Sequence, residues 1–226
     1  MSAIRFEGVS HDFGDERVVD GVTLHLTERR VGIVGANGSG KSTLARMING
    51  LVTPTVGRVE VDGLDVARQG REVRRRVGFV FTNADTQIVM PTVREDVAFT
   101  LRRHRLPATD AAARVDATLE RFGLADLADR PAHRLSGGQK QLLALASVLV
   151  GEPSIVVADE PTTLLDARNA RMIAEHFEAL DEQLVVVSHQ LDLLESFDRV
   201  VVMEAGRVVA DDASRPALDA YRALIG

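Results

Sequence analysis

The sequence predicts an α/β fold whose core alternates strands and helices, with an antiparallel β-subdomain near the N-terminus and an inserted α-helical subdomain. Short apolar runs at 31–34, 77–81, 155–158 and 184–187 are typical of buried strands. Polar or glycine-rich stretches and helical patterns follow several of these runs, which is the alternation of an α/β protein. Helical segments fill the stretch from 92 to about 134 without an intervening strand, so we expect them to form the inserted subdomain.

The composition is that of an ordinary globular chain. With 226 residues, 45% hydrophobic and 27% charged, the sequence can bury a sizeable core as one domain or as a domain with a subdomain. A net charge of -6 argues against broad, nonspecific binding to nucleic acid. Cysteine is absent, which excludes a disulfide framework and a thiolate metal site. Neither a signal-peptide pattern nor an apolar run of roughly 18 residues occurs, so we expect any membrane role to come through a partner protein.

The N-terminal residues predict an antiparallel pair of strands. Residues 3–8 and 18–26 alternate between apolar and polar side chains, and His11 to Asp15 between them are predicted to form a turn. This turn carries one aromatic side chain, Phe13, which would suit a platform for stacking a flat base. From these residues alone, an aromatic side chain that folds back on the core is an equally good interpretation.

The stretch 35–43 has the pattern G-x-x-x-x-G-K-[ST] of a phosphate-binding loop, and it lies between a predicted strand and a predicted helix. Its glycines let successive N–H groups point at one centre, and the positive end of the helix adds to the same place. Lys41 suits the outer phosphates of a nucleotide, and the Ser42 hydroxyl suits Mg²⁺. The predicted nucleotide-binding residues here are Gly35, Ala36, Asn37, Gly38, Ser39, Gly40, Lys41, Ser42 and Thr43.

The middle of the chain is predicted to contain short strands and then helices. Thr92 and Glu95 match a capping box, and Thr109 or Asp110 is expected to cap the next helix. The predicted elements, in order, are strands at 58–61 and 64–66, a helix end at 70–76, a strand at 77–81, a polar break at 82–87, and helices from 92, over 109–123 and over 124–128.

A second glycine motif, Leu135-Ser136-Gly137-Gly138-Gln139, precedes a helix that is apolar nearly all round and therefore buried. Ser136 is a good N-cap, whereas paired glycines cost helix stability and so require a reason. Bare backbone at a positive helix end is a second phosphate-binding device. A glycine-rich helix start that binds no ligand is the alternative.

Polar residues follow two of the predicted buried strands. Asp159 and Glu160 end the strand at 155–158, where paired carboxylates are costly unless they face a cation or a polar site. Asp159 suits Mg²⁺, and Glu160 suits a base that polarises the attacking water. Asp166 is expected to cap a helix over 167–180, and His189 follows the next strand, where it would contact the γ-phosphate. A hairpin over 199–204 and 207–210 and a helix over 214–225 complete the predicted elements.

The order of these motifs resembles the ATP-binding cassette (ABC) ATPases over essentially the whole chain. The resemblance implies a P-loop NTPase (RecA-like) core over 1–81 and 151–226, and a Q-loop, helical subdomain and signature helix over 82–150. It implies ATP and Mg²⁺ as ligands, with Phe13 stacked on adenine and Val18 beside it. It also implies ATP hydrolysis, for which the catalytic residues are Lys41, Glu160 and His189.

The resemblance also implies partners. Two such chains close head-to-tail, so that the signature motif of one chain contacts the γ-phosphate held by Lys41 of the other. The residues implied to contact nucleotide from this second side are Ser136, Gly137, Gly138 and Gln139, and Asp166 joins them. A homodimer bound to membrane subunits at the cytoplasmic face of the cell membrane is expected, with no nucleic acid.

Within that family, Phe79-Val80-Phe81, Asp85-Thr86-Gln87 and the stretch 90–99 resemble the ATPases of energy-coupling-factor transporters. Those proteins act with a transmembrane coupling subunit and a substrate-binding membrane subunit, and they import vitamins or transition-metal ions. The resemblance favours biotin as cargo, with cobalt or nickel as the competitor. The sequence departs from the family at Thr82, where a metal-contacting glutamine is usual, and we expect the Thr82 hydroxyl, or a water held by it, to complete the Mg²⁺ shell.

A soluble ABC ATPase that acts as a regulatory or nucleic-acid-associated clamp is the alternative function. The DNA-repair members of the family insert a long coiled coil between the two glycine motifs. The stretch between Lys41 and Leu135 is too short for that insertion and contains no heptad pattern. Glu160 and His189 also argue for hydrolysis rather than for clamping alone.

Overall fold

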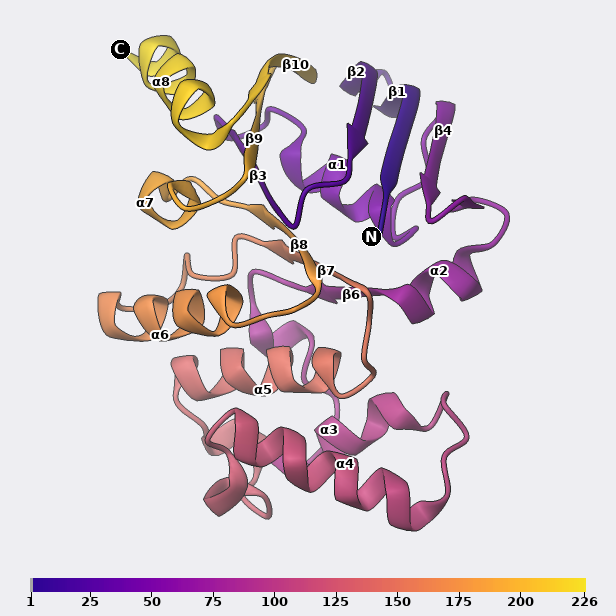
Figure 1. Ribbon diagram of the computed structural model, residues 1–226, viewed down its shortest axis with the longest axis vertical. Coiled ribbons are helices and arrows are strands. Elements are labelled where there is room, and N and C mark those ends of the chain that lie inside the picture. The colour runs from indigo at the N-terminus through magenta and orange to yellow at the C-terminus, as the bar shows by residue number, and fades with distance from the viewer. Residues whose placement is uncertain (1) are drawn as a thin grey trace. The chain divides into compact units, whose positions relative to one another are not determined.

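The computed structural model describes residues 2–226, which divide into two compact units (Figure 1). The first unit contains the described residues up to Val77, together with Ser154–Glu160 and Leu180–Gly226. The second unit contains Gly78–Pro153 and Pro161–Ala179. In residues 2–226 no helix combines the length and the apolar character that a membrane span needs.

The first unit contains an antiparallel sheet with the strand order β2-β1-β4-β5, which confirms the antiparallel strands predicted near the N-terminus. Its strands are β1 (Ile4–Phe13), β2 (Glu16–Leu26), β4 (Val56–Val61) and β5 (Leu64–Asp65). The turn predicted over His11 to Asp15 is present but shorter: it covers only Gly14 and Asp15, because β1 continues to Phe13, which pairs with Glu16. The register shifts between Phe6 and Val9, so Val9, Ser10 and His11 are all buried and the alternating pattern is interrupted there.

The core sheet of this unit is mostly parallel. Strands β10, β9, β3, β8 and β7 lie side by side in that order, and only the β9–β10 hairpin is antiparallel within this set. Their bounds are β3 (Arg30–Gly35), β7 (Ile155–Asp159), β8 (Gln183–Val187), β9 (Arg199–Glu204) and β10 (Arg207–Asp212). Every residue of β7 and β8 is buried, which explains their continuous apolar runs.

Parallel pairing brings the carboxyl ends of three strands to one edge of the core sheet. Asp159 is in register with Val187, and Val187 is in register with Ile33, two residues before Gly35. Residues that follow β3, β7 and β8 therefore meet at this edge, where ligands of open α/β sheets bind. The helices of this unit are α1 (Lys41–Ile48), α2 (Gly70–Arg76), α7 (Leu191–Leu194) and α8 (Ser214–Ile225).

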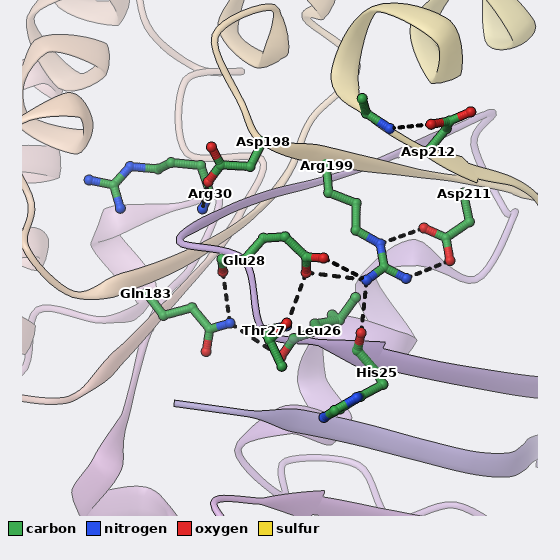
Figure 2. Close-up of polar contacts among 11 residues, drawn as sticks. His25, Leu26, Thr27, Glu28, Arg30, Gln183, Asp198, Arg199, Asp211 and Asp212 are labelled. Carbon is green, nitrogen blue, oxygen red and sulfur yellow. Dashed lines mark hydrogen bonds and ion pairs between the residues drawn. The ribbon is translucent and has the colours of Figure 1, made fainter. Parts of the chain in front are cut away.

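A polar network fixes the chain between the two sheets of the first unit (Figure 2). Gln183 Nε2 donates hydrogen bonds to the carbonyl oxygens of Leu26, at 3.3 Å, and Glu28, at 2.9 Å. Arg199 lies between Glu28 and Asp211, with two 2.6 Å bonds to the Asp211 carboxylate. The hydrogen bonds that Arg199 donates to Asp211 raise the pKa of Arg199 above its ordinary value. This network joins the end of β2 to β8, β9 and β10.

The second unit is mainly helical. Strand β6 (Val77–Val80) leads into it from Val77, and the helices are α3 (Val93–Leu101), α4 (Ala108–Arg121), α5 (Gly137–Leu149) and α6 (Ala167–Glu178). Three short 3₁₀ turns cover Ala84–Thr86, Ala125–Leu127 and Ala132–Arg134. The capping box predicted for Thr92 and Glu95 is confirmed.

The predicted cap of the helix after residue 108 is wrong. Helix α4 begins directly after Pro107, and its start has no side-chain capping bond. Thr109 lies inside the helix, and its hydroxyl bonds to the carboxylate of Asp110. Proline fixes φ near the value that a helix start needs, so the chain begins this helix without a polar cap.

Candidate nucleotide-binding site

The loop between β3 and α1 is a tightly enclosed turn of the main chain. A Cβ atom on Gly40, whose φ is 93°, would lie 2.4 Å from the carbonyl oxygen of Val18. A Cβ atom on Gly35 would lie 2.1 Å from the carbonyl oxygen of Met203. Gly38 has φ +79 and nothing within 4 Å of its Cβ position. The glycines of this loop therefore serve close backbone packing at its two ends and a left-handed turn at its centre.

Lys41 is folded onto the loop that it belongs to. Its Nζ donates a 2.7 Å hydrogen bond to the carbonyl oxygen of Ala36 and lies 3.5 Å from the Ser39 hydroxyl. Burial lowers the pKa of Lys41, and the negative charges of Glu160 and Asp159 oppose this effect. The Lys41 ammonium group is thus held beside the loop and close to both carboxylates.

The Ser42 hydroxyl and the Asp159 carboxylate come together from α1 and β7. Ser42 Oγ donates a 2.7 Å hydrogen bond to Asp159 Oδ1, and Asp159 is 1% exposed. Hard oxygen donors of this kind fit Mg²⁺, which usually binds proteins through one or two such groups and takes its other ligands from phosphates and water. No cluster of three histidine, aspartate or glutamate side chains suited to a metal occurs among residues 2–226.

Glu160 and His189 form a hydrogen-bonded pair after β7 and β8. His189 Nδ1 lies 2.7 Å from Glu160 Oε2, and the backbone N–H of His189 donates to the same oxygen at 3.4 Å. An ionised carboxylate only accepts hydrogen bonds, so a bond between these two atoms requires a His189 ring with a proton on Nδ1. Glu160 has φ 51°, a left-handed conformation that costs a non-glycine residue free energy and is typical of functional positions.

Phe13 lies at the end of β1 and is 55% exposed, which rules out an aromatic side chain folded into the core. The ring of buried His11 meets it edge-on, with ring centroids 4.5 Å apart and an interplanar angle of 86°. The hairpin that carries Phe13 and Val18 is tied to the phosphate loop through Gly206, which accepts from Asp20 N–H at 2.9 Å and donates to the carbonyl of Ser39 at 3.2 Å.

The glycine motif of the second unit lies at the start of α5. Ser136 and Gln139 form a reciprocal capping box, which confirms Ser136 as the N-cap. A Cβ atom on Gly138 would lie 2.2 Å from Asn169 Oδ1, whereas one on Gly137 would meet only Leu165, at 3.9 Å. Gly138 therefore permits close helix packing, and Gly137 leaves exposed backbone at a positive helix end.

Asp166 supports this motif from α6. Its carboxylate accepts from Asn169 N–H at 2.8 Å and from Asn169 Nδ2 at 2.9 Å, so it caps α6 as predicted and fixes the side chain that packs on Gly138. An open hollow of about 1010 Å³ in the second unit is lined by Ser136, Gln139 and Asp166, among others.

Gln87 has a role that the sequence did not indicate. Its Oε1 accepts from Phe81 N–H at 3.1 Å, and its Nε2 donates to the carbonyls of Phe79 and Ala144, each at 3.3 Å. Gln87 therefore closes the loop 81–87 and bonds it to α5. Thr82 lies at the beginning of this loop.

Two further side chains of α5 bond to the same loop. Lys140 Nζ lies 2.6 Å from Asp85 Oδ1, and Gln141 Nε2 donates to the carbonyl of Phe81 at 3.4 Å. Lys140 is one of only two lysines in the sequence. This rarity is the one feature of the sequence that singles out Lys140, and nothing in it indicates that the partner is Asp85. We call these two contacts and those of Gln87 the loop–helix links.

We predict that Gln87→Leu lowers the free energy of unfolding by about 2–3 kcal/mol, because it removes three hydrogen bonds, one of them the bond accepted from the partly buried N–H of Phe81. Thr86→Val is the matched control, because Thr86 makes one exposed bond to Asn83 and its loss should cost less than about 1 kcal/mol. Urea unfolding measures both variants. Equal unfolding midpoints would show that the Gln87 contacts contribute nothing to stability.

Comparison with known proteins identifies the family. Residues 19–163 match the family model described as ABC transporter. The chain is 43% identical over 221 residues to the biotin transport ATP-binding protein BioM of Rhizobium etli, with 98% of each chain covered. It is 40% identical over 203 residues to the energy-coupling factor transporter ATP-binding protein EcfA1 of Bacillus subtilis, with 87% of this chain and 72% of the relative covered.

A solved structure agrees with these relatives. The dimeric, post-hydrolysis structure of the ATP-binding cassette MJ0796 bound to ADP and Pi is similar, with a TM-score of 0.83, 28% identity, and coverage of 94% of this chain and 99% of that chain. The predicted P-loop NTPase fold is confirmed by this likeness and by the mixture of an antiparallel and a mostly parallel sheet. The chain belongs to the ABC transporter family, and it is one of that family's ATP-binding, ATP-hydrolysing proteins.

Proposed function

We propose that this chain is the ATP-hydrolysing subunit of an importer of the energy-coupling-factor type, which takes up a vitamin, with biotin favoured, or a transition-metal ion. The observation that carries the proposal is that one chain has two different features that would suit phosphate groups. One is the loop that holds Lys41, and the other is the exposed backbone of Gly137 at the start of α5. The similarity to a biotin transport protein and to an energy-coupling factor protein supports the transporter class and the cargo.

Membership of the ABC transporter family supports a head-to-tail homodimer that closes on ATP, in which each of the two features serves one side of the nucleotide. The loop of one chain holds the phosphates, Phe13 and Val18 of that chain hold the adenine, and Gly137 of the partner approaches the γ-phosphate. In the partner, the start of α5 is fixed by the capping box of Ser136 and Gln139 and by the close packing of Gly138 on Asn169. Asp166 accepts a hydrogen bond from Asn169 and so holds it in place. ATP then links the two chains. Hydrolysis releases them, because its products, ADP and phosphate, are both negatively charged and repel each other.

Glu160 acts as the general base in this mechanism. Its carboxylate accepts a proton from the water that attacks the γ-phosphate, and His189, hydrogen-bonded to it at 2.7 Å, fixes its orientation and reaches toward the γ-phosphate. Lys41 stabilises the negative charge on the outer phosphates. Ser42 and Asp159 would hold Mg²⁺, which would neutralise part of the phosphate charge when it is bound.

Capture from native membranes tests the transporter assignment. A tagged chain should co-purify with a transmembrane coupling subunit and a substrate-binding membrane subunit, at the cytoplasmic face of the membrane. Mass spectrometry of the complex should identify a bound solute, and vesicle uptake of labelled biotin, cobalt and nickel separates the candidate cargoes. Recovery of a homodimer alone, with little ATPase activity and no membrane protein, would instead favour the soluble clamp.

The role of Thr82 is a separate prediction. The family's usual glutamine contacts the metal and the attacking water, whereas a threonine hydroxyl is shorter, so we expect Thr82→Gln to raise ATP turnover of the assembled complex. Thr86→Gln, a change of the same kind within the same loop, is the control and should leave turnover unchanged. Equal turnover of Thr82→Gln and the parent complex would remove Thr82 from the metal shell.

A further inference from the structure

Arg46 contacts Asp159 in a way that the proposed hydrolysis mechanism does not use. Arg46 lies in the last turn of α1, and its Nη2 is 3.0 Å from Asp159 Oδ2. The Asp159 side chain is 1% exposed, and a buried carboxylate without a nearby cation carries a large desolvation cost. In the first unit, the Arg46 guanidinium is a positive group hydrogen-bonded to this carboxylate, and the Lys41 ammonium group also lies close to it.

The two oxygens of the Asp159 carboxylate have different partners. Oδ1 accepts from the Ser42 hydroxyl at 2.7 Å, and Oδ2 accepts from Arg46. Arginine frequently binds a carboxylate through two parallel hydrogen bonds. Here Nη2 of Arg46 donates to Oδ2 of Asp159 at 3.0 Å. The Nε atom of Arg46 is buried and has no hydrogen-bond partner within residues 2–226. The guanidinium is thus held beside the carboxylate through Nη2, although the Arg46 side chain is 43% exposed.

A divalent cation bound by Ser42 and Asp159 would share this carboxylate with a second positive group. Two cations on one carboxylate repel each other, and in a site of low dielectric constant this repulsion is stronger than in water. Exposure of the Arg46 side chain gives the guanidinium a path to water when such a cation arrives.

We propose that Arg46 is the internal counter-ion of Asp159: it neutralises the buried carboxylate in the nucleotide-free protein and lowers the affinity of the site for a divalent cation. The cation is then held firmly only together with the phosphates of a nucleotide, which add negative charge. This inference rests on the proposed roles of Ser42 and Asp159 as metal ligands. It assigns Arg46 as a positioning residue that acts on the metal through Asp159.

Manganese binding to the purified full chain with saturating ADP, measured by electron paramagnetic resonance, tests the proposal. Arg46→Met should tighten Mn²⁺ binding about tenfold, because it removes the competing charge and keeps the length of the side chain. The same variant should unfold at a lower temperature without metal and regain part of that loss when Mn²⁺ and ADP are added. Arg46→Lys should stay close to the parent protein in both measurements, since it keeps the charge.

Controls separate this proposal from the metal assignment itself. Arg58→Met removes an exposed ion pair with Glu7 on the antiparallel sheet and should leave Mn²⁺ affinity unchanged. Asp159→Asn should weaken Mn²⁺ binding, and an unchanged affinity there would refute the metal site rather than the counter-ion. Unchanged or weaker Mn²⁺ binding by Arg46→Met would overturn the counter-ion role and leave a purely structural ion pair.

If Arg46→Met does not fold, the parent protein still decides the question. The side-chain nitrogen resonances of Arg46 should shift when Mg²⁺ and ADP are added together, because the bond to Asp159 is released. Resonances that stay unchanged at saturating Mg²⁺ and ADP would overturn the proposal.

Discussion

Gly40→Ala is expected to destabilise the protein by about 3–5 kcal/mol and to abolish nucleotide binding, because two costs add at this position. The backbone of Gly40 has φ 93°, which an L-residue adopts only under strain, and the new Cβ atom would lie 2.4 Å from the carbonyl oxygen of Val18. That oxygen belongs to the hairpin that carries Phe13 and cannot rotate away as a flexible side chain would. Urea unfolding and binding of a fluorescent ATP analogue measure the two effects.

Gly38→Ala is the matched control for strain alone. Gly38 also has a left-handed backbone, with φ +79, but its Cβ position has no neighbour within 4 Å. We expect its alanine variant to lose only about 1 kcal/mol of folding free energy. If both variants lose the same amount, the close approach of Val18 is not what requires glycine at position 40.

Glu160→Gln is expected to lower the rate of ATP hydrolysis by about 10²–10⁴, the contribution typical of a general base. Glutamine keeps the shape of the side chain and can still accept the hydrogen bond from His189 Nδ1, but it cannot take a proton from water. ATP binding should therefore survive while turnover is lost. Single-turnover hydrolysis and ATP-analogue binding, both on the assembled complex, measure these two properties separately.

Glu120→Gln is the control for this experiment, since Glu120 is exposed on α4 in the second unit and the chemical change is the same. It should leave turnover unchanged. A small effect of Glu160→Gln would favour the clamp, in which ATP is bound but hydrolysis contributes little.

Much of the core sheet could be predicted because its central strands are buried on both faces. The runs that form β3, β7 and β8 are mostly apolar, and the polar residues that follow β7 and β8 predict that Asp159, Glu160 and His189 lie at the carboxyl ends of core strands. The loop pattern around Lys41 was equally informative, because its glycines are required by a backbone geometry that leaves a clear pattern in the sequence.

What could not be predicted depends on contacts between distant residues or on local irregularity. The bulge after Phe6 removed the alternation that would have extended β1 to Phe13. Pro107 replaced the polar cap expected at Thr109 or Asp110. Gln87 bonds to Ala144, 57 residues away, and Arg46 bonds to Asp159, 113 residues away. Local sequence patterns cannot predict contacts between residues so far apart in the chain.

The loop–helix links have a consequence for how a membrane partner and ATP would influence each other. Gln87, Lys140 and Gln141 bond the loop 81–87 to α5, and the same helix begins with the exposed backbone of Gly137. A partner that prefers one position of the loop would therefore also select one position of the helix start. By thermodynamic reciprocity, nucleotide captured at that helix start must change the affinity for the partner by the same factor as the partner changes the affinity for nucleotide.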